Sequence, residues 1–64
     1  MPKDVMADIR RGRDRLLAQT DYTQMPDYIE LHPNMTEPWK IYRQALRDFP
    51  ETVDLNNIVW PEKP

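Results

Sequence analysis

The sequence predicts a mainly α-helical protein, in which two helices form a hairpin and an extended C-terminal arm packs across it. Apolar and aromatic residues recur at helical spacing in two stretches, over about residues 3–20 and about residues 37–49. A corner with several prolines separates these stretches, and a β-branched and aromatic run that ends in prolines follows the second one. A chain of 64 residues with this pattern is expected to form a single small domain, residues 1–64.

The first helix is expected over about residues 3–20. Its apolar face follows a 4-3-4-3 spacing through Val5, Ile9, Gly12, Leu16 and Gln19. Asp4 and Asp8 lie in the early turns and the arginines come later, which suits the helix dipole. Gly12 costs about 1 kcal/mol relative to alanine inside a helix. Its place on the apolar face is therefore either a tolerated weak point or a site where another backbone comes close.

The corner is expected over residues 21–36. Pro26 pushes Met25 into an extended conformation, and Asp21 and Thr23 are suited to hydrogen-bond the backbone locally. Asp27 fits the N-cap of a single helical turn, residues 28–31. Pro33 discourages helix at the residue before it, which is the chain's one histidine. We expect a structured corner in which Tyr22 and Met25 insert towards the second helix.

The second helix is expected over about residues 37–49, with Thr36 as its N-cap and Pro38 in its first turn. Its apolar stripe is the clearest in the chain and runs through Trp39, Tyr42, Leu46 and Phe49. We expect this stripe to pack on Ile9, Leu16 and Leu17. The opposite, polar face is expected to carry Lys40, Arg43, Arg47 and Asp48. Pro50 is expected to stop the helix directly after the stripe.

The extended arm is expected over residues 51–64, because this segment has no helical pattern. Ile58 and Trp60 should point to one side and Val59 to the other. We expect Trp60 to dock in a groove lined by both helices and by the Tyr22 and Met25 side of the corner. The last three residues should remain exposed.

Composition limits what holds such a chain together. The core of a 64-residue domain is expected to supply no more than about 3–5 kcal/mol of net stability. The absence of cysteine excludes disulfides and thiolate metal sites. A partner chain or marginal stability is therefore expected. No apolar run approaches the length of a membrane span, so no membrane association is expected, and the N-terminus lacks the apolar core of a secretory signal.

Enzymatic activity is not expected. The chain has no serine and no cysteine, and none of its four threonines is next to a histidine in sequence. With 11 carboxylates some close pairs are inevitable, so Asp21 and Asp27 do not indicate acid–base chemistry. His32 precedes a proline in a turn, where it is expected to be a turn residue, and a metal role would need Asp27 or Glu30 as co-ligands. We expect no catalytic residue, no cofactor and no metal.

The most basic stretch is "RRGRDR", residues 10–15. Its arginines could contact phosphates, or they could form a solvated helix face with carboxylates three and four residues away. The segment 3–20 has five basic and three acidic residues, so its net charge is only +2. The solvated face is favoured, and nucleic-acid binding is kept as an alternative that salt dependence would test. The terminal "PEKP" matches a P-x-x-P motif, which is common by chance in a chain with seven prolines.

The large side chains are more informative about function. Two thirds of the aromatic set should form the core, and the rest exceeds what so small a domain can cover. Tryptophan and tyrosine are the usual anchors of protein interfaces. The candidates for partner binding or for the core are Tyr22, Met25, Tyr28, Trp39, Tyr42 and Trp60.

Three blocks of the sequence together resemble a known family. These are "IRRGRDRLLAQTDYTQMPD" (9–27), "WKIYRQALRDFP" (39–50) and "IVWPEKP" (58–64), in this order. They resemble the phage tail assembly chaperone-like domain, which occurs as small free-standing proteins and at the C-termini of tail-fibre proteins. Tyr22 stands where that family usually has tryptophan, and Met25 where it has leucine. The linker before the second helix and the segment "ETVDLNN" also depart from the family pattern.

The resemblance implies a non-enzymatic protein-binding role in the assembly or structure of a phage tail or tail fibre. The implied partner is a phage tail or tail-fibre protein, with self-association as a further option. The implied location is the cytoplasm of the infected bacterial host or the virion tail. A small nucleic-acid-binding regulator, acting through Arg10, Arg11, Arg13 and Arg15, and a host-directed regulatory phage protein remain the alternatives.

Overall fold

The computed structural model describes residues 4–64, so the predicted helical residue Lys3 lies outside the described residues. The element order is α1 (Val5–Thr20), η1 (Asp21–Gln24), α2 (Pro26–Leu31), η2 (Pro33–Met35) and α3 (Thr36–Thr52). Here η denotes a short 3₁₀ helix. An arm without regular secondary structure, residues 53–64, follows α3. In residues 4–64 there are thus three α-helices and no strand, as the mainly α prediction requires.

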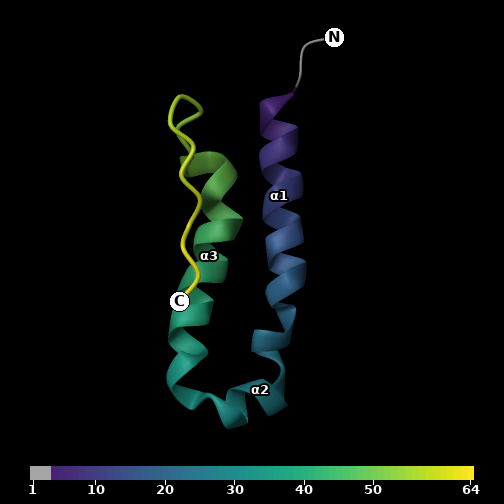
Figure 1. Ribbon diagram of the computed structural model, residues 1–64, viewed down its shortest axis with the longest axis vertical. Helices are drawn as coiled ribbons and strands as arrows, with labels where there is room; N and C mark the ends of the chain where they lie inside the picture. The colour runs from purple at the N-terminus through teal and green to yellow at the C-terminus, as the bar shows by residue number, and fades with distance from the viewer. Residues whose placement is uncertain (1–3) are drawn as a thin grey trace.

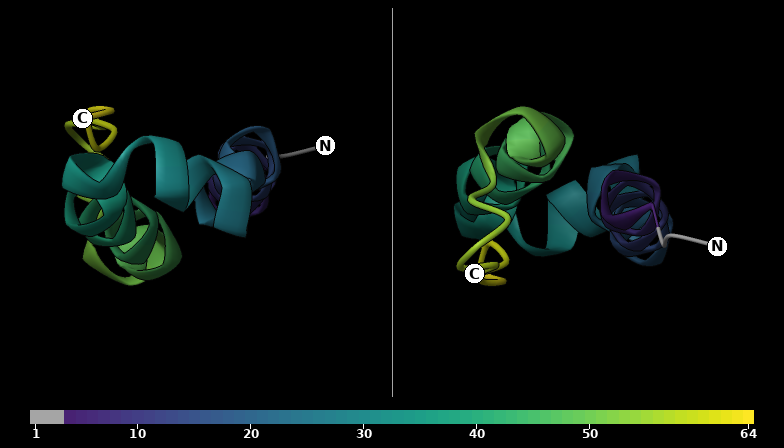
Figure 2. Two further views of the ribbon diagram at one scale, coloured as in Figure 1. Left: turned by 90° about the horizontal axis from the view of Figure 1, so that it is seen from below. Right: turned by 90° about the horizontal axis from the view of Figure 1, so that it is seen from above.

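The long helices α1 and α3 lie side by side and run in opposite directions, as Figures 1 and 2 show. Between them, η1, α2 and η2 form the closed end of the hairpin, opposite the end where α1 begins (Figure 1). The molecule is elongated, with extents of 47 × 19 × 13 Å. The arm turns back at the end of α3 and returns alongside that helix, rather than lying evenly across both helices (Figure 1).

Asp4 is the N-cap of helix α1, whereas the sequence predicted it within the early turns of the helix. The Asp4 backbone is extended, and its Oδ1 accepts a hydrogen bond of 3.1 Å from the backbone N–H of Ala7. The buried face differs in part from the prediction, because Ile9 and Thr20 are buried whereas Gln19 is exposed. Val5 is also exposed, at 41%. The buried face of α1 therefore includes Thr20. Its hydroxyl accepts a hydrogen bond from Arg43 of α3, a contact that helical spacing does not predict.

The corner contains a longer helix than expected. Helix α2 begins at Pro26 rather than at residue 28, and Asp27 lies in its first turn instead of serving as its N-cap. The extended residue before the helix is Met25, whose side chain makes no capping hydrogen bond. Proline explains the earlier start, because its fixed φ suits the first helical position and its missing N–H has no partner to lose there.

Helix α3 also begins differently from the prediction. Thr36 is the first helical residue and not an N-cap, with φ −60° and ψ −53°. The 3₁₀ helix η2 leads directly into α3, so the chain has no extended residue between them. An N-cap residue needs an extended backbone. Pro33 at the start of η2 has its φ fixed at a helical value, so the helical turns begin before Thr36.

Pro50 does not stop α3, contrary to the prediction. The helix continues to Thr52 with Pro50 inside it. Proline removes one N–H from the helix, but the final turn is closed by the Val53 N–H, which donates to the Phe49 carbonyl over 2.8 Å. Pro50 therefore lies in the last turn, where a single missing bond is tolerated.

The core lies between α1 and α3, and the predicted stripe forms it. Leu46 is fully buried, and Trp39, Tyr42 and Phe49 are each less than 10% exposed. Leu16 and Leu17 of α1 pack against the core cluster of Trp39, Tyr42 and Leu46, as the sequence predicted. Burial of a large apolar side chain stabilises the folded state by about 1.5–3 kcal/mol. The stripe is therefore the main stabilising feature of the hairpin.

The arm contributes one large side chain to the helical pair. Trp60 packs against the core cluster, and its ring lies 4.4 Å from that of Phe49, centroid to centroid. It therefore docks between the helices, as predicted. The predicted involvement of the corner is wrong, since Tyr22 and Met25 are more than half exposed. Trp60 instead lies beside Gly12, nearly three helical turns of α1 away from Tyr22.

Candidate protein-binding site

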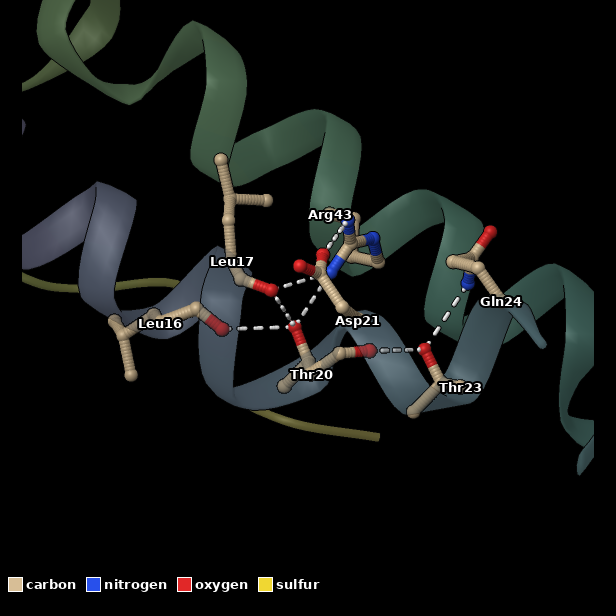
Figure 3. A network of polar contacts seen from close by, with 7 residues as sticks. All are labelled: Leu16, Leu17, Thr20, Asp21, Thr23, Gln24 and Arg43. Carbon is tan, nitrogen blue, oxygen red and sulfur yellow. Dashed lines mark hydrogen bonds and ion pairs between the residues drawn. The ribbon is translucent and has the colours of Figure 1, made fainter.

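The polar residues of the corner are tied together by one buried arginine. Figure 3 shows Arg43 reaching from α3 to the C-terminal end of α1. Its Nη1 donates to the carbonyl of Leu17 and to the hydroxyl of Thr20, each over 2.8 Å. Its Nη2 donates to Asp21 Oδ1 over 2.8 Å, which is also an ion pair. The guanidinium thus serves as a cap for the last turn of α1, where carbonyls lack helical partners.

The threonine hydroxyls extend this network into η1. Thr20 Oγ1 donates to the Leu16 carbonyl over 2.8 Å, and Thr23 Oγ1 donates to the Thr20 carbonyl over 2.7 Å (Figure 3). Gln24 Nε2 donates to Thr23 Oγ1 over 3.0 Å. Both threonines are almost completely buried. These hydroxyls are therefore occupied in shaping the chain reversal, and they are not presented to a substrate.

Arg43 is the residue that sequence reasoning misplaced. It was expected on the polar face of α3, yet it is only 7% exposed. A signal was present, because position 43 follows Trp39 by four residues and precedes Leu46 by three, which places it beside the apolar stripe. Its Nε is buried without a hydrogen-bond partner in the described part of the chain, so the network is not fully satisfied.

The six candidate residues separate into three groups. Trp39 and Tyr42 are buried in the core, whereas Tyr28 and Trp60 are half-buried at its edge. Tyr22 and Met25 are 53% and 58% exposed, so they do not insert towards α3. The core residues can reach a partner only if the fold opens. The two corner residues are available as the protein stands.

A row of rings connects the exposed corner to the core. The Tyr22 and Tyr28 rings meet edge to face at 5.4 Å, and Tyr28 lies 4.6 Å from the His32 ring. The Trp39 indole N–H donates to the Tyr28 hydroxyl over 2.9 Å. Trp39 in turn meets Tyr42 edge to face at 5.7 Å. Because each ring contacts its neighbour, the outermost one is held in place by the folded core.

We name five large side chains of the closed end that are exposed or half-buried the hairpin-end surface. It consists of Tyr22, Met25, Tyr28, Leu31 and His32. Leu31, which sequence reasoning did not single out, is 75% exposed and is the most exposed large apolar side chain among residues 4–64. Its position in a six-residue helix with no buried residue explains that exposure.

Carboxylates predominate in the sequence that forms the hairpin-end surface. Residues 16–39 include four carboxylates and no lysine or arginine. Asp21 is paired with Arg43. Asp27, Glu30 and Glu37 have no ion pair within residues 4–64. The closed end thus combines exposed apolar side chains with three carboxylates that form no ion pair within residues 4–64.

The arginine-rich stretch of α1 is partly neutralised by its own neighbours. Arg11 pairs with Asp8 at 2.6 Å, and Arg13 pairs with Asp14 at 2.9 Å. Arg13 also reaches across to the carbonyl of Arg47 at 3.5 Å. Arg10 and Arg15 are exposed. Two of the four arginines are therefore engaged in local structure, which weakens the phosphate-binding interpretation.

Other kinds of site find no support in the described residues. No group of three histidines, cysteines or carboxylates in residues 4–64 lies close enough to hold a metal ion. The His32 side chain is exposed at the end of α2, and the His32 backbone N–H donates to the Tyr28 carbonyl over 2.9 Å. Burial raises the pKa of the Tyr42 hydroxyl above its usual value of 10.0. None of the helices in this part of the chain combines the length and apolarity that a membrane span needs.

Comparison with known proteins gives one result. A family model described as "Phage tail assembly chaperone protein" matches residues 6–64. The match includes both long helices, the corner and the arm. No curated protein and no solved structure matches the chain.

Proposed function

The chain belongs to the phage tail assembly chaperone family, and from this premise we propose that it is a non-enzymatic protein-binding module. It acts in the assembly or structure of a phage tail or tail fibre, and its partner is a tail or tail-fibre subunit. Its place of action is the cytoplasm of the infected host, with retention in the virion tail as the other outcome. The family match over nearly the whole chain is the observation that carries this proposal.

The hairpin-end surface is the region proposed to contact the partner. Tyr22, Met25 and Leu31 are each more than half exposed, and all three lie in the short segment that closes the hairpin. The corner is firmly held by Arg43 and by the row of rings, so little conformational entropy remains to be lost there on binding. Tyrosine is enriched at the hot spots of protein interfaces, so an exposed tyrosine that its neighbours hold in place is suited to anchor a partner.

The charges around this surface indicate the chemistry of the partner. Asp27, Glu30 and Glu37 favour a partner that presents lysine or arginine beside an apolar pocket. Such charges mainly increase the rate of association and the specificity, whereas the apolar contacts supply most of the affinity. The association is therefore expected to weaken moderately with salt and strongly when the apolar residues are removed.

A catalytic role is not part of the proposal. The corner hydroxyls of Thr20 and Thr23 are buried and donate to backbone carbonyls. Asp21 accepts from Arg43 and so acts in the structure of the corner. These three residues carry the polar chemistry of the stretch "TDYT", and each is used to hold the fold.

The test is co-purification of the tagged chain with individual tail and tail-fibre subunits of the phage that encodes it. One subunit should form a stable complex with the parent chain. Tyr22→Ser and Met25→Ser should each weaken that complex by at least tenfold. Ile41→Ser is the matched control, because Ile41 is 68% exposed and lies on α3, outside the hairpin-end surface.

The two kinds of substitution separate the possible outcomes. Equal loss of binding in the corner variants and in Ile41→Ser would place the interface elsewhere or show a general effect of lost apolar surface. Asp27→Asn with Glu30→Gln should slow association and reduce its salt dependence. No binding to any tail or fibre subunit would contradict the proposed function itself.

A further inference from the structure

The arm attaches to the helical pair through one principal contact. A Cβ atom placed on Gly12 would lie 3.0 Å from Cη2 and 3.1 Å from Cζ2 of Trp60. These separations are closer than ordinary carbon contacts, so the absence of a side chain at residue 12 gives the indole its place on α1. Phe49 of α3 forms the other wall, at a ring distance of 4.4 Å. We call this space between Gly12 and Phe49 the indole notch.

The remainder of the arm is loosely held. Ile58 and Val59 are 42% and 66% exposed, and residues 62–64 are exposed as well. No hydrogen bond joins residues 58–64 to any part of the described chain. An open hollow of about 510 Å³ lies where the arm runs along the C-terminal half of α3, and its lining includes Ala45, Phe49, Val59 and Pro61. The arm therefore fits α3 incompletely when it folds back on its own chain.

The bend that returns the arm to its own helices is short and simple. The Asn57 N–H donates to the Asp54 carbonyl over 3.0 Å, and the Asn56 N–H donates to Asp54 Oδ1 over 2.9 Å. Leu55, at the tip of this bend, is 49% exposed. We call residues 54–57 the hinge. Straightening the hinge breaks only these two hydrogen bonds, and it leaves the Trp60 contact free to form with another molecule.

From these observations we propose that the indole notch also binds the arm of a second copy of this chain, so that two copies exchange arms reciprocally. The occupant is chosen because the arm is the segment whose fit to the notch is observed. Exchange keeps the Trp60 contact and repeats it by symmetry in the second copy. It also brings the apolar residues of the two hinges and arms together where the chains cross, and these are side chains that the folded-back arm leaves in water. The proposal goes beyond the proposed function and does not depend on it.

The parent chain should dimerise as its concentration rises. Sedimentation velocity over a wide concentration range should show a monomer that converts to a dimer and to no larger species. Tyr22→Ser should leave this dimer unchanged because the hairpin-end surface is not involved. A parent chain that stays monomeric at millimolar concentration would overturn the proposal.

Shortening the hinge gives a sharper test. Deletion of residues 55–57 removes the bend, so the arm can no longer return to its own helices. The shortened chain should be a stable dimer at concentrations at which the parent is a monomer, and the indole N–H signal of Trp60 should keep its docked NMR position. A shortened chain that is monomeric with a solvated Trp60 would overturn the proposal.

Blocking the notch provides the matched control. Gly12→Leu in the shortened chain fills the indole notch, and leucine is a better helix former than glycine. This variant should be monomeric, with helicity by circular dichroism equal to that of the parent. If it is not folded, Trp60→Ala in the shortened chain removes the same contact from the exposed arm and should give the monomer. A dimer that persists in this second variant would show association through another surface and would refute arm exchange.

Discussion

Removal of the Arg43 guanidinium tests how the corner is held. Arg43→Met keeps an unbranched apolar stem of similar length and removes the hydrogen bonds to Leu17, Thr20 and Asp21. Hydrogen bonds that involve a charged group contribute about 1.5–3 kcal/mol each. The two bonds to the buried acceptors therefore account for about 3 kcal/mol at the lower bound.

Two effects modify this value. The Asp21 side chain is 63% exposed, so its ion pair contributes at most about 1 kcal/mol. The unpartnered Nε of Arg43 costs about 1 kcal/mol or more in the parent, and Arg43→Met removes that cost. The expected net destabilisation is about 2 kcal/mol, which lowers Tm by roughly 8–16 °C for a domain of this size.

Thermal melting followed by circular dichroism measures the effect. The Tm of Arg43→Lys should lie between that of Arg43→Met and that of the parent. An ammonium group keeps the charge but cannot reproduce the planar guanidinium, whose two terminal nitrogens donate to different acceptors. Asp21→Asn should change the free energy of unfolding by less than about 1 kcal/mol. If Arg43→Met melts at the parent temperature, the network in Figure 3 does not stabilise the corner, and the reasoning is refuted.

Three further predictions concern the helices and the core. Leu46→Ala should cost about 2–5 kcal/mol in urea unfolding, because Leu46 is fully buried, and a value under 1 kcal/mol would contradict that burial. Asp4→Ala should cost about 1 kcal/mol by removing the α1 cap, whereas Asp4→Asn, which retains an acceptor, should cost much less. Burial holds the pKa of Tyr42 above 10.0 in the folded state, so stability should be unaffected below that pH and should fall as pH rises through the raised pKa. Tyr42→Phe should remove this part of the alkaline loss in pH-dependent melting, and an unchanged alkaline slope would refute the assignment.

The two long helices and the core were predictable because their signals are periodic. Trp39, Tyr42, Leu46 and Phe49 recur at helical spacing, and a stripe of this kind has to be buried against another apolar surface. The structure buries all four. The docking of Trp60 followed from its size, since an isolated extended arm has no reason to carry an indole.

The corner was less predictable because its structure depends on contacts between distant parts of the chain. Arg43 interacts with residues 22 to 26 positions earlier in the sequence, and no local pattern specifies that partner. The expectation that Tyr22 and Met25 point inwards failed for the same reason. Arg43 and the two threonines already fill the inner side of the turn, so the large side chains are directed to solvent.

The helix ends were misplaced because proline has two opposite effects. Pro26 starts α2, and Pro50 is tolerated in the last turn of α3. Proline is favourable at the first helical position and unfavourable in the interior. Its effect near a helix end depends on whether the freed carbonyl finds another partner, which sequence does not show.

Hydrogen exchange in the complex tests the central claim most directly. The measurement compares amide exchange in the free chain with exchange in the complex with the tail or fibre subunit that co-purifies. The proposed interface predicts slower exchange in the complex at residues 22–32, with α1 residues 10–15 unchanged. Protection of residues 10–15 with none at residues 22–32 would contradict it.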